Sequence, residues 1–578
     1  MGVPGLFSNL IREYQKNEVI KKIIPNDDPN HLYLDFNCAI YTAFNANIIG
    51  IKTEEALILH TIEYLETLCR VIPNLELIYI AIDGVPPFGK CIQQRQRRFH
   101  SICKKNRTNK INEMYGNVLD IGAVNNDIDL NMITPGTPFM AKLGIAIKNA
   151  IKNNSGHNIN NVFKGKKVFF SDASIPGEGE HKIMKHLRDA KHLAVDGTEE
   201  ERILYGADHN TIIYGLDADL INLSLIQHIP NMYLFREANE YGHLATSFEG
   251  KKYLFMDIDE LKGAVIESFR KYYPGLDIMK VNKYINDYVF LGMLLGNDFM
   301  PKCHWFSLHS GGYDIFISAY FQVHNHTELF LVNADSLQIN TEMLADIWFL
   351  IKNQEQDKVV ALFEKRKRAR IHVKEEMTER ERQQLVADCY PLQHLYVEQQ
   401  IEPAKPNWQA RYYKICLNMD KSEPNLQTIC QAYLKTLVWN FMYYFNECPS
   451  WDWYYSYPYA PTFTDIYNEL LQHRNINNFT FGKTAPLDQQ TLLCCVLPFA
   501  SRKYMIRDVS AKLVSEKCAL RTYFPKRYGI NVAFHNRYHE CTPIIPNIDI
   551  EKVKKFIKEC KMTEDEYARN LVGKLFIV

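Results

Sequence analysis

Short apolar segments that end on acidic residues recur through the first three hundred residues of the chain. They cover residues 31–35, 77–83, 167–172 and 211–219, and each is rich in β-branched or aromatic side chains. The stretches between them carry helical patterns, as at residues 54–71 and 180–190. Buried strands that alternate with helices predict an α/β fold with a mostly parallel sheet. Ligands of such sheets bind beyond the carboxyl ends of the strands, where these acidic residues fall.

The alternation of strands and helices fades after about residue 330. A charged stretch at residues 354–382 is typical of a solvated helix or linker, and aromatic residues crowd the segment 439–459. We therefore predict an α/β core over residues 1–330, a charged helical linker over 331–390, and a mainly helical, aromatic-rich second region over 391–578. The second region is expected to wall the entrance to a site on the core.

The composition is that of an ordinary globular protein, with 578 residues, 46% of them hydrophobic and 23% charged, and a formal net charge of zero. No apolar run reaches the roughly 20 residues that span a bilayer. The first residues also lack a signal-peptide pattern, so we expect an intracellular protein without membrane contact. The fourteen cysteines are scattered without a C-x-x-C pair, which indicates neither a zinc site nor a disulfide framework.

Seven acidic residues stand at predicted strand ends or at junctions between a loop and a helix. They are Asp35, Asp83, Glu178, Glu180, Asp217, Asp219 and Asp298. For a single aspartate a helix cap or a turn is the commoner role, but seven in this placement are expected to share one cleft. Buried carboxylates in that number require cations, and hard oxygen ligands suit Mg²⁺ or Mn²⁺ rather than zinc. Two such ions about 3.5–4 Å apart promote in-line displacement at phosphorus, which predicts phosphodiester hydrolysis.

A basic segment follows directly on Asp83. It begins at Lys90 and continues through Arg97, Arg98 and further lysines, and no Asp or Glu occurs from residue 85 to residue 112. A solvated basic helix face would be the simpler interpretation if the segment stood alone. Because it adjoins the acidic set, we predict an anion site beside the cleft, since guanidinium groups bind phosphate through paired hydrogen bonds. The basic cluster at residues 365–370 is flanked by glutamates, and we expect it on an exposed helix.

Two aromatic positions are candidates for stacking on a nucleotide base. Tyr41 lies six residues beyond Asp35, where the chain leaves a predicted strand. In the second region the candidate is Trp451, with Trp453 as the alternative. A stacked aromatic typically contributes about 1–3 kcal/mol per base. For the other aromatic residues core packing is the expected role.

In these residues and in the segments around them, the sequence resembles the XRN family of 5′-to-3′ exoribonucleases nearly from end to end. The matching segments are the Met1-Gly-Val-Pro start and residues 33–37, 82–85, 90–98, 133–137, 176–184, 214–220 and 296–299, and, in the second region, 449–455, 459–461 and 496–498. The Pro-Gly-Glu-Gly-Glu-His-Lys and Gly-Leu-Asp-Ala-Asp blocks are highly specific to the family.

The resemblance implies a nuclease core of the PIN/FEN-like type that removes nucleotides processively from single-stranded RNA with a 5′-monophosphate. The seven acidic residues would hold two Mg²⁺ or Mn²⁺ ions. The residues of the 5′-phosphate pocket would be Lys90, Gln94, Arg97 and Arg98. The terminal base would stack between Tyr41 and Trp451, although family members usually carry histidine at the position of Tyr41. Without the long extensions of large family members, the chain is expected to be a compact monomer with no specified protein partner.

Two alternatives stay open at this point. Related sheets with acidic clusters also cut DNA, and nothing in the sequence identifies a contact to a ribose 2′-hydroxyl, so the first is a flap-type DNA nuclease. The second is a non-catalytic RNA-binding scaffold, although a binding groove gains nothing from negative charge near phosphates. We expect a cytoplasmic rather than a nuclear location, which would be the host cytoplasm if this compact chain is viral.

Overall fold

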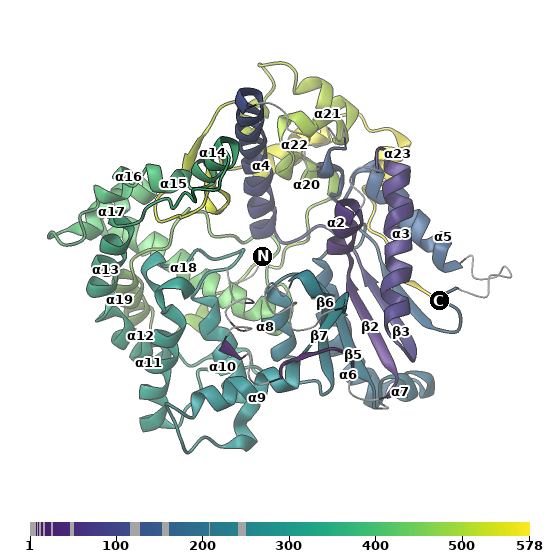
Figure 1. The fold of residues 1–578 in the computed structure, drawn as a ribbon, viewed down its shortest axis with the longest axis horizontal. Coiled ribbons are helices and arrows are strands. Elements are labelled where there is room, and N and C mark those ends of the chain that lie inside the picture. The colour runs from purple at the N-terminus through teal and green to yellow at the C-terminus, as the bar shows by residue number, and fades with distance from the viewer. Residues whose placement is uncertain are drawn as a thin grey trace.

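A sheet of eight strands organises the part of the chain that the structure describes. The computed structural model describes residues 7, 10, 13–14, 18–24, 27–46, 51–115, 128–152, 161–206, 208–240 and 250–578. The strand order is β1-β7-β6-β5-β2-β3-β4-β12. Figure 1 shows the sheet right of the centre, with helices on both of its faces and a large helical part beside it. The Met1-Gly-Val-Pro start lies outside the described residues.

The central strands run parallel, as predicted from the sequence. They are β2 (Asn30–Asp35), β3 (Leu75–Ala81), β4 (Lys167–Ser171), β5 (Asn210–Tyr214) and β6 (Met232–Glu237). The antiparallel strands are β1 (Ile20–Lys21), β7 (Tyr253–Asp257) and β12 (Phe576–Ile577). Because β2 lies between β3 and β5, the carboxyl ends of these three strands meet at one edge of the sheet.

The strands are buried on both faces because their alternate side chains enter two different cores. Leu32 and Leu34 of β2 pack in one core, and Tyr33 between them packs in the other. Helices of the first core are α2 (Phe36–Ala46), α3 (Glu54–Val71) and α5 (Pro138–Lys152). Those of the second core are α6 (Gly179–Asp196), α7 (Glu199–Gly206), α8 (Asp219–Leu225), α9 (Ile258–Phe269) and α10 (Val281–Met293).

The rest of the described chain is mainly helical, as predicted for the second region. Its longer helices are α11 (Gly312–Thr327), α12 (Thr341–Lys352), α13 (Glu355–Lys367), α14 (Glu379–Asp388), α17 (Trp408–Leu417), α18 (Glu423–Phe445), α19 (Phe463–His473), α20 (Gln489–Val496) and α22 (Ile550–Lys558). The shorter helices are α15 (Tyr390–Gln393), α16 (Tyr396–Gln399), α21 (Arg507–Lys512) and α23 (Glu564–Ala568). Two small antiparallel strand pairs are also present, formed by β8 (Val332–Asn333) with β9 (Gln338–Ile339) and by β10 (Gly529–Asn531) with β11 (Thr542–Ile544). The predicted boundaries at residues 330 and 390 stay a prediction.

The basic segment forms most of one long helix, α4 (Phe88–Tyr115), which rises from the sheet in Figure 1. Residues from 390 onwards contact it near both of its ends. Arg95 is buried and donates hydrogen bonds to the carbonyl oxygens of Cys495 and Tyr523. Farther along, the guanidinium of Arg107 lies 4.0 Å from the ring centre of Tyr390 and 4.2 Å from that of Tyr538. These contacts fix the direction in which α4 leaves the sheet.

Two further observations concern the predicted surface features. None of the described helices combines the length and the apolar character needed to cross a bilayer. In the basic cluster after residue 364, the lysines and arginines are exposed as expected, except for Arg366. Arg366 is buried and pairs with Glu398 at 2.5 Å, because its side chain turns inward from the end of α13.

Candidate active site

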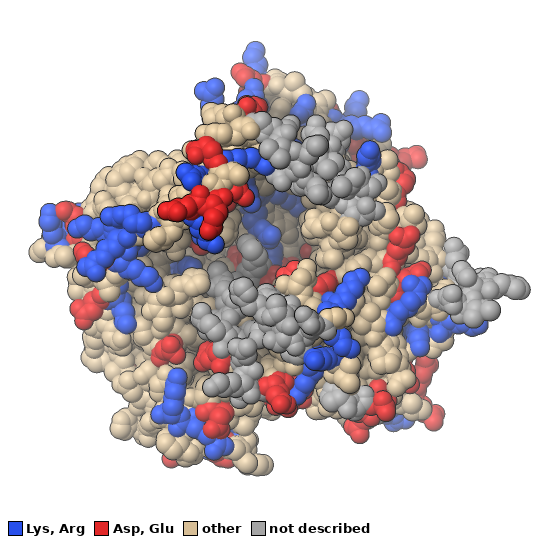
Figure 2. Space-filling view, viewed as in Figure 1, with Lys and Arg blue, Asp and Glu red and all other residues tan. Residues whose placement is uncertain are grey.

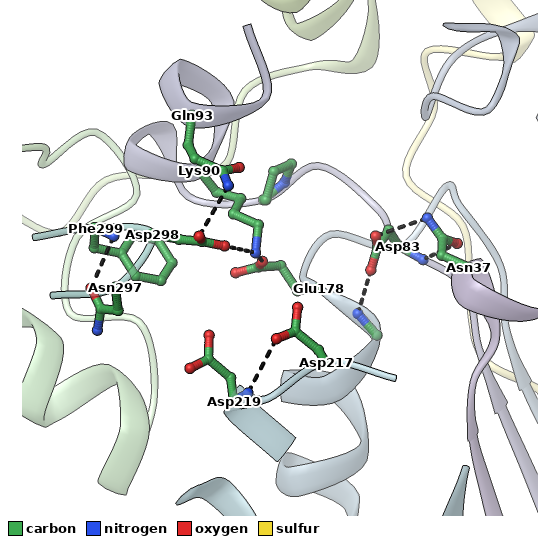
Figure 3. A network of polar contacts seen from close by, with 12 residues as sticks. Asn37, Asp83, Lys90, Gln93, Glu178, Asp217, Asp219, Asn297, Asp298 and Phe299 are labelled. Atoms are coloured by element: carbon green, nitrogen blue, oxygen red, sulfur yellow. Dashed lines mark hydrogen bonds and ion pairs between the residues drawn. The ribbon is translucent and has the colours of Figure 1, made fainter. Parts of the chain in front are cut away.

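The structure brings the seven predicted acidic residues to one edge of the sheet. Asp35 is the last residue of β2, Asp83 follows β3, Asp217 follows β5, and Asp219 is the first residue of α8. The remaining three come from helix junctions: Glu178 and Glu180 at the start of α6, and Asp298 after α10. Figure 3 shows Glu178, Asp217, Asp219 and Asp298 around one centre, with Asp83 to one side, where it accepts a hydrogen bond from Asn37. Their role as metal ligands stays a prediction.

A glycine turn brings the Glu178 loop against the end of β2. Gly177 adopts a φ of +111°. Its carbonyl oxygen accepts a hydrogen bond from the N–H of Gly84, and its own N–H donates to the carbonyl oxygen of Val85, so that it is tied to the loop after β3. Gly179 then donates its N–H to Asp83 Oδ1 at 2.6 Å. A Cβ on Gly179 would lie 2.5 Å from Asp35 Oδ1. Only glycine therefore allows α6 to begin so close to these two carboxylates.

Lys90 is the cation that contacts the acidic residues from α4. Its Nζ lies 2.6 Å from Glu178 Oε2 and 2.7 Å from Asp298 Oδ2. Gln93, one turn farther along α4, donates a hydrogen bond to Asp298 Oδ1 at 3.0 Å. Burial alone would lower the pKa of Lys90, but Asp298 and Glu178 outweigh it and hold that pKa well above its ordinary value. The side chain is therefore a protonated counter-ion inside the acidic set.

The carboxylates repel one another strongly in this buried setting. Burial, then the charges of Asp83 and Asp217, raise the pKa of Asp35 well above its ordinary value. Burial and Asp217 do the same to the pKa of Glu180, and they raise the pKa of Asp219 to about 7. A buried cluster of this kind is stabilised when further positive charge enters it. The electrostatics thus favour the binding of cations at this edge of the sheet.

Two adjacent tyrosines of the second region complete the surroundings of the cluster. Tyr443 donates its hydroxyl hydrogen to Glu178 Oε1 at 2.9 Å, and Tyr444 donates to Asp219 Oδ1 at 2.7 Å. The ring of His181 stacks on Tyr443 at 3.7 Å between centroids. These residues were not predicted as part of the site. More than 200 positions separate each tyrosine from its carboxylate, so no local sequence pattern indicates the contact.

Three neighbouring residues at the start of α6 also have the chemistry of metal ligands. Within the described residues, Glu178, Glu180 and His181 each offer a ligand atom, and these atoms lie within 4.8 Å of one another. Burial lowers the pKa of His181 well below its ordinary value, which leaves its ring neutral and able to coordinate a metal. His181 adds a nitrogen donor to a set that sequence analysis took to be all oxygen.

The predicted phosphate-binding residues continue along α4 from Lys90. Gln94 and Arg98 follow at intervals of four residues, so they lie on the same side of the helix as Lys90, with Arg97 next to them. Gln94 Oε1 and Arg98 Nη1 are buried and have no hydrogen-bond partner among the described residues. Burial lowers the pKa of Arg98 to about 10. Unpartnered buried polar atoms are rare in folded proteins, and a phosphate would supply a partner for the guanidinium nitrogen of Arg98.

This arrangement is visible on the molecular surface. Figure 2 shows a hollow near the centre of one face, and Lys and Arg side chains gather inside it on the side where Figure 1 places α4. Acidic side chains lie deeper in the same hollow. Basic and acidic side chains thus both face this hollow.

The aromatic candidates differ in their exposure and in their contacts. Tyr41 of α2 is 39% exposed. Its ring is exposed, whereas its hydroxyl group is buried, and that burial raises the pKa of the hydroxyl. The charges of Arg98 and Arg97 oppose this rise, which indicates that the hydroxyl lies near the predicted phosphate-binding residues. The ring of Trp453 contacts Lys435, whose Nζ lies 4.5 Å from the ring centroid. The Nε1–H of Trp453 donates a hydrogen bond to Thr436.

Trp451 stands where α4 begins. Its carbonyl oxygen accepts a hydrogen bond from the N–H of Phe88, the first residue of that helix, at 2.8 Å. The side chain is half-buried. The engagement of the Trp453 ring favours Trp451 as the stacking candidate, and the role of both Tyr41 and Trp451 in stacking stays a prediction.

Comparisons with known protein families agree with this geometry. A family model described as the XRN 5′-3′ exonuclease N-terminus matches residues 1–238, and one described as the Xrn1 helical domain matches residues 278–405 and 397–578. The chain belongs to the XRN family. This confirms the resemblance inferred from the motifs and the nuclease-type core with a helical second region.

Three curated relatives show how much of a family member the chain covers. A 5′-3′ exoribonuclease 2 homolog of Drosophila melanogaster is 25% identical over 99% of this chain and 73% of its own length. The 5′-3′ exoribonuclease 1 of Homo sapiens is 26% identical over 99% of this chain and 35% of its own length. The 5′-3′ exoribonuclease 1 of Saccharomyces cerevisiae is 22% identical over 99% of this chain and 44% of its own length. The chain thus spans about three quarters of one relative and less than half of the other two.

Proposed function

We propose that this XRN family member is a 5′-to-3′ exoribonuclease that processively hydrolyses single-stranded RNA with a 5′-monophosphate to nucleoside 5′-monophosphates. The observation that carries the proposal is the position of α4. Its first turn places Lys90 in contact with Glu178 and Asp298, and its next two turns carry Gln94, Arg97 and Arg98. A row of anion-binding groups thus begins at the edge of a carboxylate cluster, as required to hold a terminal phosphate beside a site of phosphodiester hydrolysis.

The residues present fit two divalent cations, Mg²⁺ or Mn²⁺. The donor set consists mainly of buried carboxylate oxygens, which are hard ligands, and their mutual repulsion is relieved by added positive charge. Residues that would hold the ions are Asp35, Asp83, Glu178, Glu180, Asp217, Asp219 and Asp298, with His181 as a further donor. When bound, a pair of such ions stabilises the attacking and leaving oxygens of an in-line displacement.

The side chains of this protein would then bind and orient the RNA end. Arg98, through its unpartnered Nη1, and Arg97 would bind the 5′-phosphate through charge-assisted hydrogen bonds. A 5′-hydroxyl end offers no such charge and would bind more weakly. Tyr41 beside the arginines and Trp451 at the base of α4 would stack on the terminal base and retain the strand between cycles. Hydrolysis of the next linkage leaves a new 5′-phosphate, which can enter the same pocket.

The proposal is tested with end-defined substrates. The protein is incubated with Mg²⁺, Mn²⁺ or EDTA and with single-stranded RNA that carries a 5′-monophosphate, a 5′-hydroxyl or a 5′-triphosphate, and with a 5′-flap DNA. We expect mononucleotides from the 5′-monophosphate RNA alone and no product in EDTA. Preferred cleavage of the flap DNA, or release of nucleotides from the 3′ end, would overturn the proposal.

A matched pair of variants shows whether the acidic cluster performs the reaction. Asp217→Asn keeps the size of the side chain and removes one charge from the cluster, and it should reduce mononucleotide release by at least about 100-fold. Asp189→Asn removes a charge from an exposed position of α6, where Asp189 pairs only with Lys185 at 3.7 Å among the described contacts. Equal activity of the two variants would contradict the assignment of the site. The monomeric state and the cytoplasmic location stay predictions.

A further inference from the structure

The ammonium group of Lys90 occupies the space between carboxylates from two different elements. Glu178 belongs to the loop before α6, and Asp298 follows α10, yet both contact Lys90 Nζ, at 2.6 and 2.7 Å. The lysine is 8% exposed, and the side chains of both partners are 5% exposed. Figure 3 shows the ammonium reaching down from α4 between these two carboxylates. A divalent cation that used Glu178 and Asp298 as ligands would have to share this space with a charge of the same sign.

Lys90 shares one side of α4 with two of the predicted phosphate-binding residues. Lys90, Gln94 and Arg98 recur every four residues on α4, and a helix places such residues in one row. The donor Arg98 Nη1 has no hydrogen-bond partner among the described residues, whereas the donor Lys90 Nζ has two ion-pair partners. The acidic cluster therefore already uses the ammonium of Lys90, while Arg98 at the other end of the row keeps an unpartnered donor.

A lysine is suited to serve both sides in turn. Its ammonium is a compact charge on a flexible stem of four carbons, so that it reaches different partners by rotation about single bonds. Like charges a few ångströms apart in a buried site repel strongly, and an anion at the pocket would attract the displaced ammonium. A cation bound to Glu178 and Asp298 would push the ammonium of Lys90 away from these carboxylates. An anion bound to Arg98 would attract the ammonium in the same direction.

We propose that Lys90 couples the two halves of the site: it neutralises Glu178 and Asp298 while the pocket is empty and moves to the 5′-phosphate when a divalent cation binds. This inference rests on the proposed function. It means that the cation and the phosphorylated end promote each other's binding, because linkage requires the two effects to be equal. A 5′-hydroxyl end would not recruit the ammonium and would leave the affinity for the cation low.

The test measures Mn²⁺ binding rather than catalysis. Free Mn²⁺ is titrated by electron paramagnetic resonance with the protein alone, with a 5′-phosphorylated dinucleotide whose linkage is an uncleavable methylphosphonate, and with its 5′-hydroxyl counterpart. In the wild type we expect the phosphorylated dinucleotide to tighten Mn²⁺ binding at least fivefold and the hydroxyl form to change it less than twofold. In Lys90→Met we expect Mn²⁺ to bind at least tenfold tighter than in the wild type without any dinucleotide. The coupling in that variant should fall below twofold.

The controls separate this inference from the proposed function. Lys185→Met removes a lysine from the exposed side of α6, where it pairs with Glu447 at 2.9 Å, and should leave both the affinity and the coupling within twofold of the wild type. If Lys90→Met does not fold, Lys90→Gln replaces it, because its amide can still donate to Glu178. Fivefold coupling that persists in the uncharged Lys90 variant would overturn the inference alone. A wild type that binds no Mn²⁺ would overturn the proposed function and the inference with it.

Discussion

Single hydroxyl groups of the second region orient the carboxylates of the core. Tyr443 and Tyr444 are 3% and 2% exposed, and each donates to one acidic residue from the end of α18. A buried carboxylate that keeps such a donor has fewer orientations available before a cation binds. Groups that hydrogen-bond metal ligands typically change metal affinity about 10- to 100-fold when they are removed.

We therefore expect Tyr443→Phe with Tyr444→Phe to weaken Mn²⁺ binding by roughly tenfold while the protein stays folded. The measurement is a calorimetric titration with Mn²⁺, accompanied by circular dichroism. Tyr433→Phe is the matched control, because Tyr433 is a buried residue of α18 that packs on Tyr455 instead of a carboxylate. If the double variant binds Mn²⁺ as tightly as Tyr433→Phe does, the two hydroxyl groups have no orienting role.

A buried histidine makes the stability of the sheet depend on pH. His31 of β2 is 1% exposed, stacks on His209 at 3.9 Å, and has no hydrogen-bond partner for its ring nitrogens among the described residues. Burial, followed by the charges of His209 and His186, lowers the pKa of His31 to about 3. The unfolded chain, with an ordinary pKa near 6.5, therefore binds one more proton than the folded chain between these values.

The sign of the effect follows from this difference in proton binding. Stability from neutral His31 is fully present above about pH 6.5 and is lost as the pH falls towards 3, by at most about 1.4 kcal/mol per pH unit. The unfolding free energy is measured in urea between pH 4.5 and 6.5. As the pH is lowered, we expect it to fall less steeply in His31→Phe than in the wild type, with a difference in slope of up to about 1.4 kcal/mol per pH unit. The exposed His192 of α6 is the control for loss of a histidine. An unchanged slope in His31→Phe would contradict the assignment.

At the scale of the elements, α4 divides its arginines between two tasks. Arg95 is buried against backbone carbonyls of the second region, whereas Arg97 is exposed and Arg98 keeps an unpartnered Nη1. Neighbouring residues on a helix point in directions about 100° apart. One run of basic residues therefore both anchors the helix and lines the hollow.

Arg97→Ala with Arg98→Ala should remove the preference for a 5′-phosphate, because the charged donors of the pocket are lost. We expect the ratio of degradation rates for 5′-phosphate and 5′-hydroxyl RNA to fall at least tenfold, with a smaller effect on the 5′-hydroxyl substrate. Lys104→Ala with Lys105→Ala removes the same charge from exposed positions of α4 and serves as the control. A preference that is reduced equally in both double variants would indicate a general effect of charge.

The sequence predicts the elements that carry local patterns. Stretches of a few residues are enough to predict the parallel strands, the placement of Asp35 and Asp217 at their ends, and the helix that begins near residue 180. The inward turn of Arg366 to Glu398 cannot be predicted in this way, nor can the donation from Tyr444 to Asp219, because each depends on packing between segments far apart in the chain. Periodicity indicates which side of an element is buried but not which partner it meets.

At the scale of the whole molecule, the second region helps to build the site on the core. It supplies the hydroxyl groups of Tyr443 and Tyr444 and the Trp451 oxygen that caps the start of α4. It also supplies β12, which joins the edge of the sheet beside β4, where Val168 and Val578 exchange two backbone hydrogen bonds. Without these partners the edge of β4 would be exposed. The buried carboxylates of the core would also lose the tyrosine hydroxyl groups that donate to them.

We therefore expect a fragment of residues 1–330 to lack the function of the full chain, although these residues contain all seven acidic residues and the whole of α4. It should bind Mn²⁺ at least tenfold more weakly and show a broad thermal transition, because Arg95 and the start of α4 lose their partners. The control is the full chain with a protease site inserted near residue 372, an exposed position after α13. After cleavage both halves are present, so Mn²⁺ affinity should stay within about threefold of the uncut protein. A fragment that binds Mn²⁺ as the full chain does would show instead that residues 1–330 form an independent domain.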